Sequence, residues 1–309
     1  IIAGTGISYA NSQGLKAQAD KIAESGNTAL TELLNVKEPS DETFMVNLEN
    51  IAASSKELEE LSKIKLHASD IGEEKNPEEF LERVVFLARF RDKESSRGSV
   101  WSQKKMSVGF LITSRYVLAN MHNKGVTKEY HKPMVFNEGV FYNGQIVATS
   151  RKYDLTLFRL DAEIKKVNPL QIAHEDTLKK RETVYLPTKI STSRLAYRYE
   201  KGETPVTVVN PGVENTIRRG ISLDRFYYVD KSRLGEFYRG ALQSTIPTQA
   251  YMSGSPVVNS KAQLVGLAIR GSSNGTTSTL PSDIFNFIRN YTGEAERHYA
   301  GKTGKGEVK

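Results

Sequence analysis

Late in the chain the sequence reads Ala250-Tyr-Met-Ser-Gly-Ser-Pro-Val-Val-Asn259. Ser253 is followed by a glycine, a second serine and Pro256, which are the residue types that tight turns prefer. The apolar, β-branched pair after the proline is typical of a strand. By itself this pattern is typical of an ordinary loop that leads into a strand. A function for Ser253 therefore depends on what the rest of the chain supplies.

The composition is that of a globular protein, and it limits the chemistry available to the chain. Its 309 residues are enough for one large domain or two modest ones. Apolar runs stay well short of the roughly 18 residues that a membrane span requires. The absence of cysteine excludes disulfides, thiolate nucleophiles and cysteine-ligated zinc. We also find no metal-ligand cluster, phosphate loop or dinucleotide fingerprint, so we predict no cofactor.

Charge divides the chain into two parts. Residues 1–90 hold 9 basic and 16 acidic residues, a net charge of −7. The remaining residues hold 34 basic and 20 acidic residues, a net charge of +14. This difference predicts two regions with different roles.

The first part of the chain is predicted to be mostly helical. Residues 1–10 fit two interpretations, either the end of a signal peptide with its small-residue cleavage site or a frayed terminus. Residues 11–95 are predicted to form three or four amphipathic helices, because apolar residues recur at three- and four-residue multiples. These residues include Leu30, Leu33, Leu34, Phe44, Leu48, Ile51, Leu58 and Leu61. Asn76-Pro77 is typical of a helix start, followed by an apolar run over 80–88. This segment is either a cap on the main domain or a regulatory pro-segment whose acidic face meets it.

From residue 96 onward the pattern changes to short strands separated by turn residues, which is typical of an all-β barrel or sandwich. The predicted strands span 107–113, 116–119, 133–136, 140–142, 145–148, 155–160, 183–186, 206–209, 226–229 and 264–269. A helix is predicted over 282–291. The basic tail, residues 292–309, is predicted to be flexible.

Three stretches of this β region resemble the motifs of the chymotrypsin- and trypsin-like serine peptidases. Residues 109–122, Gly-Phe-Leu-Ile-Thr-Ser-Arg-Tyr-Val-Leu-Ala-Asn-Met-His, resemble the strand pair that ends in the catalytic histidine. Residues 153–160, Tyr-Asp-Leu-Thr-Leu-Phe-Arg-Leu, resemble the strand that follows the catalytic aspartate. Residues 253–259 resemble the nucleophile turn. The order His, Asp, Ser is the family's order, and the intervals of 32 and 99 residues suit its two-barrel domain.

The resemblance covers about residues 100–290 and implies a mainly β fold of two six-stranded antiparallel barrels. The peptidase domain is expected over 96–291, preceded by the helical segment. The chain looks most similar to cysteine-free bacterial branches, namely HtrA-type peptidases, exfoliative toxins and glutamyl endopeptidases. Secreted animal members usually carry disulfides, so the resemblance implies a bacterial protein, and the first ten residues favour secretion or the cell envelope.

The resemblance also implies a catalytic triad. His122 would accept the proton of the Ser253 hydroxyl during attack and return it to the leaving amine. Asp154 would hold the imidazole in the required tautomer and offset its charge. The oxyanion hole would be formed by the backbone N–H groups of Tyr251 and Ser253. The family has glycine in place of Tyr251 and Asn or Asp in place of Met252, and losing one oxyanion donor costs on the order of 3 kcal/mol.

Substrate preference is indicated by three further residues. Thr248 lies where the family lines its primary specificity pocket, Ala268 replaces a histidine of the glutamyl endopeptidases, and Arg270 is expected near the pocket mouth. A small or acidic residue before the cleaved bond is the resulting expectation.

Three functions remain open from the sequence. The first is a serine endopeptidase that acts on protein or peptide substrates. The second is an inactive or attenuated relative that binds protein, as Tyr251 and Met252 would favour. The third is nucleic-acid binding through scattered basic pairs such as Lys179-Lys180 and Arg218-Arg219, which is disfavoured because no aromatic–basic motif accompanies them. The sequence leaves the oligomeric state open.

Overall fold

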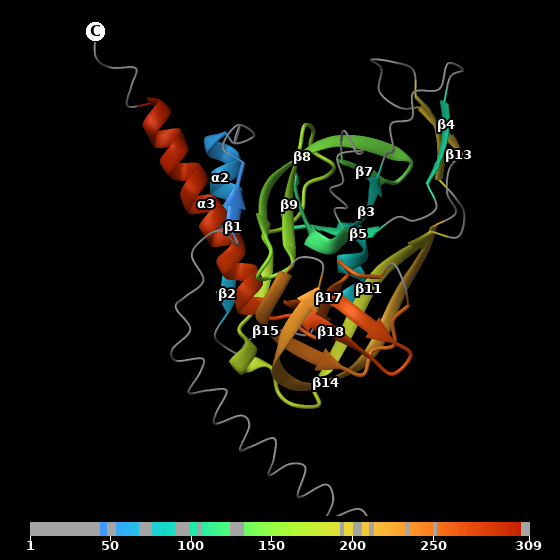
Figure 1. Ribbon diagram of the computed structural model, residues 1–309, viewed down its shortest axis with the longest axis vertical. Coiled ribbons are helices and arrows are strands. Elements are labelled where there is room, and N and C mark those ends of the chain that lie inside the picture. Colours follow the sequence, from blue (N-terminus) through green and yellow to red (C-terminus); the bar gives the residue numbers. More distant parts are fainter. Residues whose placement is uncertain are drawn as a thin grey trace, which may run out of the picture. The chain divides into compact units, whose positions relative to one another are not determined.

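The computed structural model describes residues 44–47, 54–67, 76–89, 99–103, 107–123, 133–191, 195–199, 206–209, 213–232, 235–249 and 252–303 (Figure 1). The chain divides into two compact units, Ile1–Thr43 and Phe44–Lys309, and every described residue belongs to the second. The predicted signal-peptide remnant and the predicted helix around Leu30 lie outside the described residues. The described part of the second unit contains two large sheets, a small one, and helices.

The first sheet closes into a six-stranded antiparallel barrel. Around the barrel the order is β8–β7–β3–β5–β6–β9, and β9 pairs again with β8. The strands are β3 (Val84–Arg89), β5 (Ser107–Leu111), β6 (Tyr116–Asn120), β7 (Pro133–Asn137), β8 (Val140–Ser150) and β9 (Leu155–Leu160). The prediction of a mainly β fold with such a barrel is confirmed.

Strand β6 shows why this part of the sequence is so apolar. Val117 packs into one cluster with Val85, Leu111 and Phe158, whereas Tyr116 and Leu118 pack into another that includes the C-terminal helix. Because side chains alternate along a strand, both faces of β6 are buried, and all of its residues are buried, including the polar Asn120 at its end.

The second large sheet has the order β16–β11–β14–β15–β18–β17–β10–β2, with a further pairing between β16 and β17. Its strands are β2 (Lys65–His67), β10 (Gln171–Ala173), β11 (Thr183–Ser191), β14 (Val213–Ser232), β15 (Gly235–Ser244), β16 (Pro256–Asn259), β17 (Leu264–Ser272) and β18 (Gly275–Thr279). Strands β10–β17 and β10–β2 pair in parallel, and the other neighbours pair antiparallel. A small sheet joins β4 (Ser99–Gln103), β12 (Leu195–Tyr199) and β13 (Val206–Val209).

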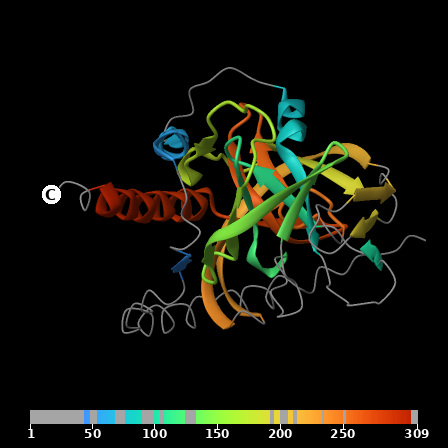
Figure 2. The same cartoon turned by 90° about the horizontal axis from the view of Figure 1, so that it is seen from above.

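The segment before the first barrel follows a different course from the predicted run of helices. Strand β1 (Phe44–Val46) pairs with β8, and β2 pairs with β10, so the segment joins both large sheets. Between them, α2 (Ser55–Ser62) packs on the C-terminal helix α3 (Pro281–Thr303). Ser54 caps α2 by accepting a hydrogen bond from Glu57 N at 3.3 Å. Figure 2 shows α2 beside α3, where α3 extends away from the sheets.

The predicted helix over residues 76–88 is wrong beyond its first turns. Asn76 and Pro77 do begin a helical element, the 3₁₀-helix η3 (Pro77–Arg83), with the Asn76 side chain accepting from Glu78 N. Val84 then starts β3, which pairs with β5 and β7. A short apolar run fits a buried strand as well as a buried helix. Here the run forms a strand because β5 and β7 provide hydrogen-bonding partners on both of its edges. The first barrel therefore begins before residue 96. Phe44, likewise predicted in a helix, lies in β1.

Helix α3 is longer than the predicted helix over 282–291 and continues to Thr303, into the tail predicted to be flexible. Its Ile284, Phe287 and Tyr291 are buried against Leu58 and Leu61 of α2. Fully burying an apolar side chain of this size contributes roughly 1.5–3 kcal/mol, which explains why the helix is held there.

Candidate active site

The register between β6 and β9 brings His122 and Asp154 together. Asn120, the last residue of β6, pairs with Leu155, the first residue of β9. In an antiparallel pair, the chain that leaves one strand lies beside the chain that enters the other. Met121 N accordingly donates a hydrogen bond to Asp154 O at 2.8 Å. The histidine and the aspartate are therefore neighbours although 32 residues separate them in sequence.

The Asp154 carboxylate contacts His122 through both of its oxygens. His122 Nδ1 lies 2.6 Å from Asp154 Oδ2, and His122 N donates to Asp154 Oδ1 at 2.8 Å. An ionised carboxylate only accepts hydrogen bonds, so Nδ1 carries the proton and Nε2 is left as an acceptor. Asp154 is buried, whereas the His122 side chain is 37% exposed. The pair can thus take up a proton at the outer nitrogen of the ring.

Asp154 adopts a left-handed backbone conformation, with φ of +56°. Aspartate tolerates this region better than most residues with a Cβ. The turn is closed by Asp154 N donating to Arg151 O at 3.3 Å, and Asn120 Nδ2 donates to Asp154 O at 3.4 Å. These contacts hold the carboxylate in place beneath the histidine.

Ser253 lies in a tight turn that is attached to β17. Gly254 N donates to Ala268 O at 2.8 Å, and Ala268 N donates to Ser255 O at 2.9 Å. Gly254 has φ of +94°, a conformation that glycine adopts at little cost. The Ser253 hydroxyl donates to Ile269 O at 2.9 Å. The serine is thereby positioned by the second sheet, whereas His122 and Asp154 belong to the first.

Residues 97–267, more than half of the chain, match the family model of the trypsin-like peptidase domain. The chain belongs to this family. The resemblance stated from the His122, Asp154 and Ser253 motifs is confirmed at the level of the family. A comparison with curated proteins finds no match.

Solved structures similar to this trypsin-like domain include the Rv3671c protease of M. tuberculosis. Its active form is 15% identical, with a TM-score of 0.49, covering 73% of this chain and 88% of that chain. A mutant of the same protease in its inactive form is 11% identical, with a TM-score of 0.49, covering 72% of this chain and 98% of that chain.

Arg239 is a residue of this trypsin-like domain that the sequence does not single out. It comes from β15, in the second sheet, and is 4% exposed. Its Nη1 lies 3.9 Å from Asp154 Oδ2, and its Nη2 donates to Arg151 O at 2.9 Å. Arg239 therefore contacts both the carboxylate and the turn that carries it. An arginine within a polar strand segment has no sequence signature that would reveal this role.

Met252 replaces the polar residue that other trypsin-like domains have before the serine. Its side chain is buried, and its Sδ lies 3.4 Å from Gln249 N, which donates to it. Met252 N in turn lies 3.3 Å from Gln249 O. Met252 is thus bonded to Gln249 through both its backbone and its side chain, and the side chain lies in the protein interior. Tyr251, the predicted oxyanion donor, lies outside the described residues.

Of the three residues predicted to contact substrate, Ala268 is hydrogen-bonded to the serine turn through its backbone. Thr248 is buried, and its N donates to Ser272 O at 2.8 Å. Its hydroxyl has no hydrogen-bond partner among the described residues and lies over Gly271, where a Cβ would overlap it. Ala268 is buried beneath the turn, and Arg270 is exposed on β17. That these three residues contact substrate stays a prediction.

Within the described ranges, no group of histidine, aspartate and glutamate side chains is arranged to hold a metal ion. None of the described helices is long and apolar enough to cross a membrane.

Proposed function

We propose that the chain is a serine endopeptidase that hydrolyses peptide bonds of protein substrates through His122, Asp154 and Ser253. The observation that carries the proposal is the contact of 2.6 Å between His122 Nδ1 and Asp154 Oδ2. It supports a histidine that accepts a proton at Nε2. The catalytic domain would be of the two-barrel type, with Ser253 supplied by the second sheet and the other two residues by the first barrel.

In the proposed reaction, the Ser253 oxygen attacks the carbonyl carbon of the scissile peptide while His122 Nε2 takes its proton. The buried Asp154 carboxylate stabilises the imidazolium that forms. The tetrahedral intermediate collapses when the C–N bond breaks and His122 returns the proton to the amine. Water then attacks the resulting ester, with His122 again accepting a proton, and hydrolysis frees Ser253.

Attack requires the Ser253 hydroxyl to leave the Ile269 carbonyl, to which it donates at 2.9 Å. Rotation about the Cα–Cβ bond of Ser253 breaks the hydrogen bond to Ile269 O, and its loss costs about 1 kcal/mol net. The oxyanion would be stabilised by the N–H groups of Ser253 and Tyr251. Thr248 and Arg270 would favour a small or acidic residue before the cleaved bond. We further propose that the protein is bacterial and acts outside the cytoplasm, since the cysteine-free chain resembles bacterial branches of the family.

The test is labelling of the full chain with a fluorophosphonate probe, which reacts only with an activated serine. The wild-type chain is expected to be labelled, and Ser253→Ala is expected to abolish labelling. Ser255→Ala is the matched control, because Ser255 is a second serine of the same turn whose Oγ contacts Thr188 Oγ1 at 2.7 Å. Absence of labelling in folded wild-type protein would overturn the endopeptidase proposal.

A second candidate is a catalytically attenuated domain that binds protein. The observations in its favour are the buried Met252 beside the serine and the engagement of the Ser253 hydroxyl with Ile269 O. This candidate predicts folded protein that is not labelled yet retains a protein partner in the His122→Ala and Ser253→Ala variants. The endopeptidase predicts loss of activity in both variants.

A further inference from the structure

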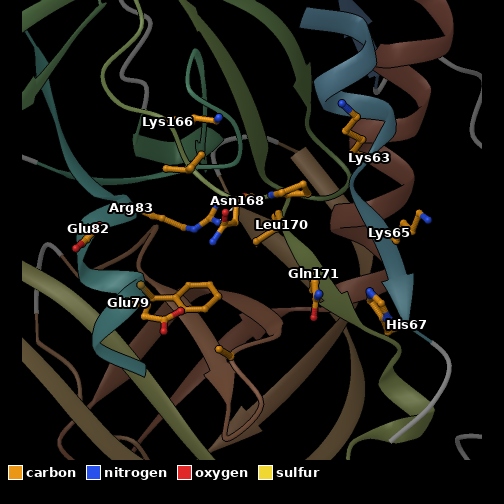
Figure 3. A pocket seen from close by; sticks show the side chains of 14 residues that line it. Lys63, Lys65, His67, Glu79, Glu82, Arg83, Lys166, Asn168, Leu170 and Gln171 are labelled. Atoms are coloured by element: carbon orange, nitrogen blue, oxygen red, sulfur yellow. Dashed lines mark hydrogen bonds between the residues drawn. The ribbon is translucent and has the colours of Figure 1, made fainter. Parts of the chain in front are cut away.

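A cavity of about 820 Å³ lies in a different part of the molecule from the serine site. Its walls are the end of α2 with β2, the 3₁₀-helix η3, and the residues that lead into β10 (Figure 3). None of His122, Asp154 and Ser253 lines it. A volume of this size is within the range of pockets that hold small molecules or several peptide side chains.

Arg83 is a buried cation on the wall of this cavity. It is 9% exposed, and its Nη1 and Nη2 donate to Leu111 O at 3.4 Å and to Asn168 O at 2.5 Å. These two bonds leave N–H groups of the five-donor guanidinium available. Both partners are neutral carbonyls, and among the described residues no carboxylate lies within 4.0 Å of the guanidinium. Burial lowers the pKa of Arg83 to about 10, because desolvation disfavours the charged form.

Three lysines also line the cavity, and only part of their charge is compensated. Figure 3 shows Lys63, Lys65 and His67 across the cavity from Arg83, with Lys166 near the upper edge. Lys63 pairs with Glu59 at 2.7 Å, but no ion pair is formed by Lys65 or Lys166 with any described residue.

Two acidic residues also line the cavity. Glu82 is engaged by Lys165 at 2.7 Å, which leaves Glu79 as the other carboxylate, on η3 with Arg83 and across the cavity from Lys65. The cavity therefore presents uncompensated positive charge.

The remaining lining favours a peptide over a nucleotide. Val167 and Pro169 offer apolar surface, and Asn168 and Gln171 offer amide groups for a peptide backbone. Phe80 is the lining aromatic ring, but it is already stacked on Phe110 at 5.7 Å and lies 5.7 Å from the Arg83 guanidinium. Of the lining rings, only the His67 imidazole, on the wall opposite Arg83, is left for a nucleobase to stack on, whereas a carboxylate fits the geometry of arginine.

We propose that this cavity is a second binding site, which takes an acidic peptide segment of a partner protein and pairs one of its carboxylates with Arg83. Lys65 and Lys166 receive neighbouring carboxylates, and the apolar wall receives the intervening side chains. Binding at this site does not require catalysis at Ser253. The two proposals are therefore independent, and failure of the endopeptidase proposal would not contradict this one.

The test measures fluorescence anisotropy of a fluorescein-labelled Ala-Glu-Ala-Glu-Ala-Glu peptide added to the full chain carrying Ser253→Ala, which prevents cleavage. The matched probe has glutamine in place of each glutamate. The acidic peptide is expected to bind at least about 10-fold more tightly than the neutral one, a factor that corresponds to 1.4 kcal/mol. Binding is expected to weaken with added salt.

Variants assign the binding to this cavity. Arg83→Met is expected to weaken binding about 10-fold. Lys65→Gln and Lys166→Gln, which lie at the rim and leave the fold intact, are each expected to weaken it about 2- to 5-fold. Lys180→Gln is the control, because Lys180 is an exposed lysine outside the cavity that pairs with Asp224.

Three results would overturn the proposal. They are equal affinity for the neutral peptide, a loss in Lys180→Gln as large as in the two rim variants, and displacement of the probe by inorganic phosphate at lower concentration than by unlabelled peptide. If Arg83→Met fails to fold, Lys65→Gln and Lys166→Gln still test whether the acidic peptide binds in this cavity.

Discussion

Arg239 Nη1 lies 3.9 Å from Asp154 Oδ2, although the two residues come from different sheets. Both side chains are 3% exposed. At such low solvent exposure, an arginine near a carboxylate influences the position of the carboxylate as well as its charge. Because Nη2 of the same guanidinium holds Arg151 O, Arg239 connects the second sheet to the turn that carries the aspartate.

We expect Arg239→Met to reduce kcat of the proposed peptidase by up to about 100-fold, the effect of displacing a positioned group by about 1 Å. KM should change little, because Arg239 does not touch substrate. Arg239→Lys should restore part of kcat by keeping the charge. Steady-state kinetics on a peptide substrate provide the measurement. The control is Arg225→Met, which removes an exposed arginine that pairs with Asp176. A change in KM alone would contradict a positioning role.

Asp154→Asn tests the orientation of the histidine. The amide can donate to Nδ1 and so favours the wrong tautomer, and kcat is expected to fall by a factor on the order of 10⁴. The fold should survive, since the amide is similar in size to the carboxylate. The measurements are kcat on a peptide substrate and the rate of fluorophosphonate labelling, with circular dichroism as the control for folding. Labelling at the wild-type rate would exclude Asp154 from the mechanism.

Gly254→Ala and Gly139→Ala form a matched pair. Both glycines have positive φ, +94° and +87°, so both substitutions should cost about 1–2 kcal/mol of stability. Gly139 has no atom within 4 Å of its would-be Cβ and lies in the turn between β7 and β8. Only Gly254→Ala should slow labelling of Ser253, because only that turn carries the serine. Denaturant unfolding and labelling rates, measured together, separate the two effects.

Stability should fall as pH rises above about 10, the ordinary tyrosine pKa. Tyr116 and Tyr291 lie with their hydroxyl oxygens 3.3 Å apart, and burial raises the pKa of both phenols. The folded state therefore keeps the protons that the unfolded chain releases. Each phenol lowers the free energy of unfolding by at most about 1.4 kcal/mol per pH unit in this range.

Urea unfolding between about pH 8 and about pH 11, from roughly two units below the ordinary tyrosine pKa to roughly one unit above it, measures this slope. Tyr116→Phe should make the slope shallower, because one of the two perturbed phenols is gone. Tyr227→Phe, at an exposed tyrosine, should leave the slope unchanged. The same slope in all three proteins would refute the assignment.

The segment interpreted as either a cap or a regulatory pro-segment also has a structural consequence. Residues 84–89 form β3, which pairs with β5 and β7 in the first barrel. Cleavage near residue 95 followed by loss of the preceding segment would remove a barrel strand. A version of the chain that begins near Ser99 is therefore expected to be unstable, with a thermal unfolding midpoint well below that of the full chain.

The sequence by itself determined the family and most of the barrel strands. It also predicted that His122 and Asp154 lie close together. The motifs and strands are local properties, since apolar runs, turn residues and the strands flanking each motif are close together in the chain. The contact of His122 with Asp154 is not local: it was expected from the family resemblance and is made by the pairing of β6 with β9. The helix predicted over 76–88 was wrong because Val84 to Leu87 form a strand only where β5 and β7 supply hydrogen-bonding partners. Only the tertiary structure revealed Arg239 beside Asp154 and the cavity around Arg83. Both join residues that are distant in sequence, and no local pattern records such a contact: it exists only once packing has brought the two sheets and the segment before them together.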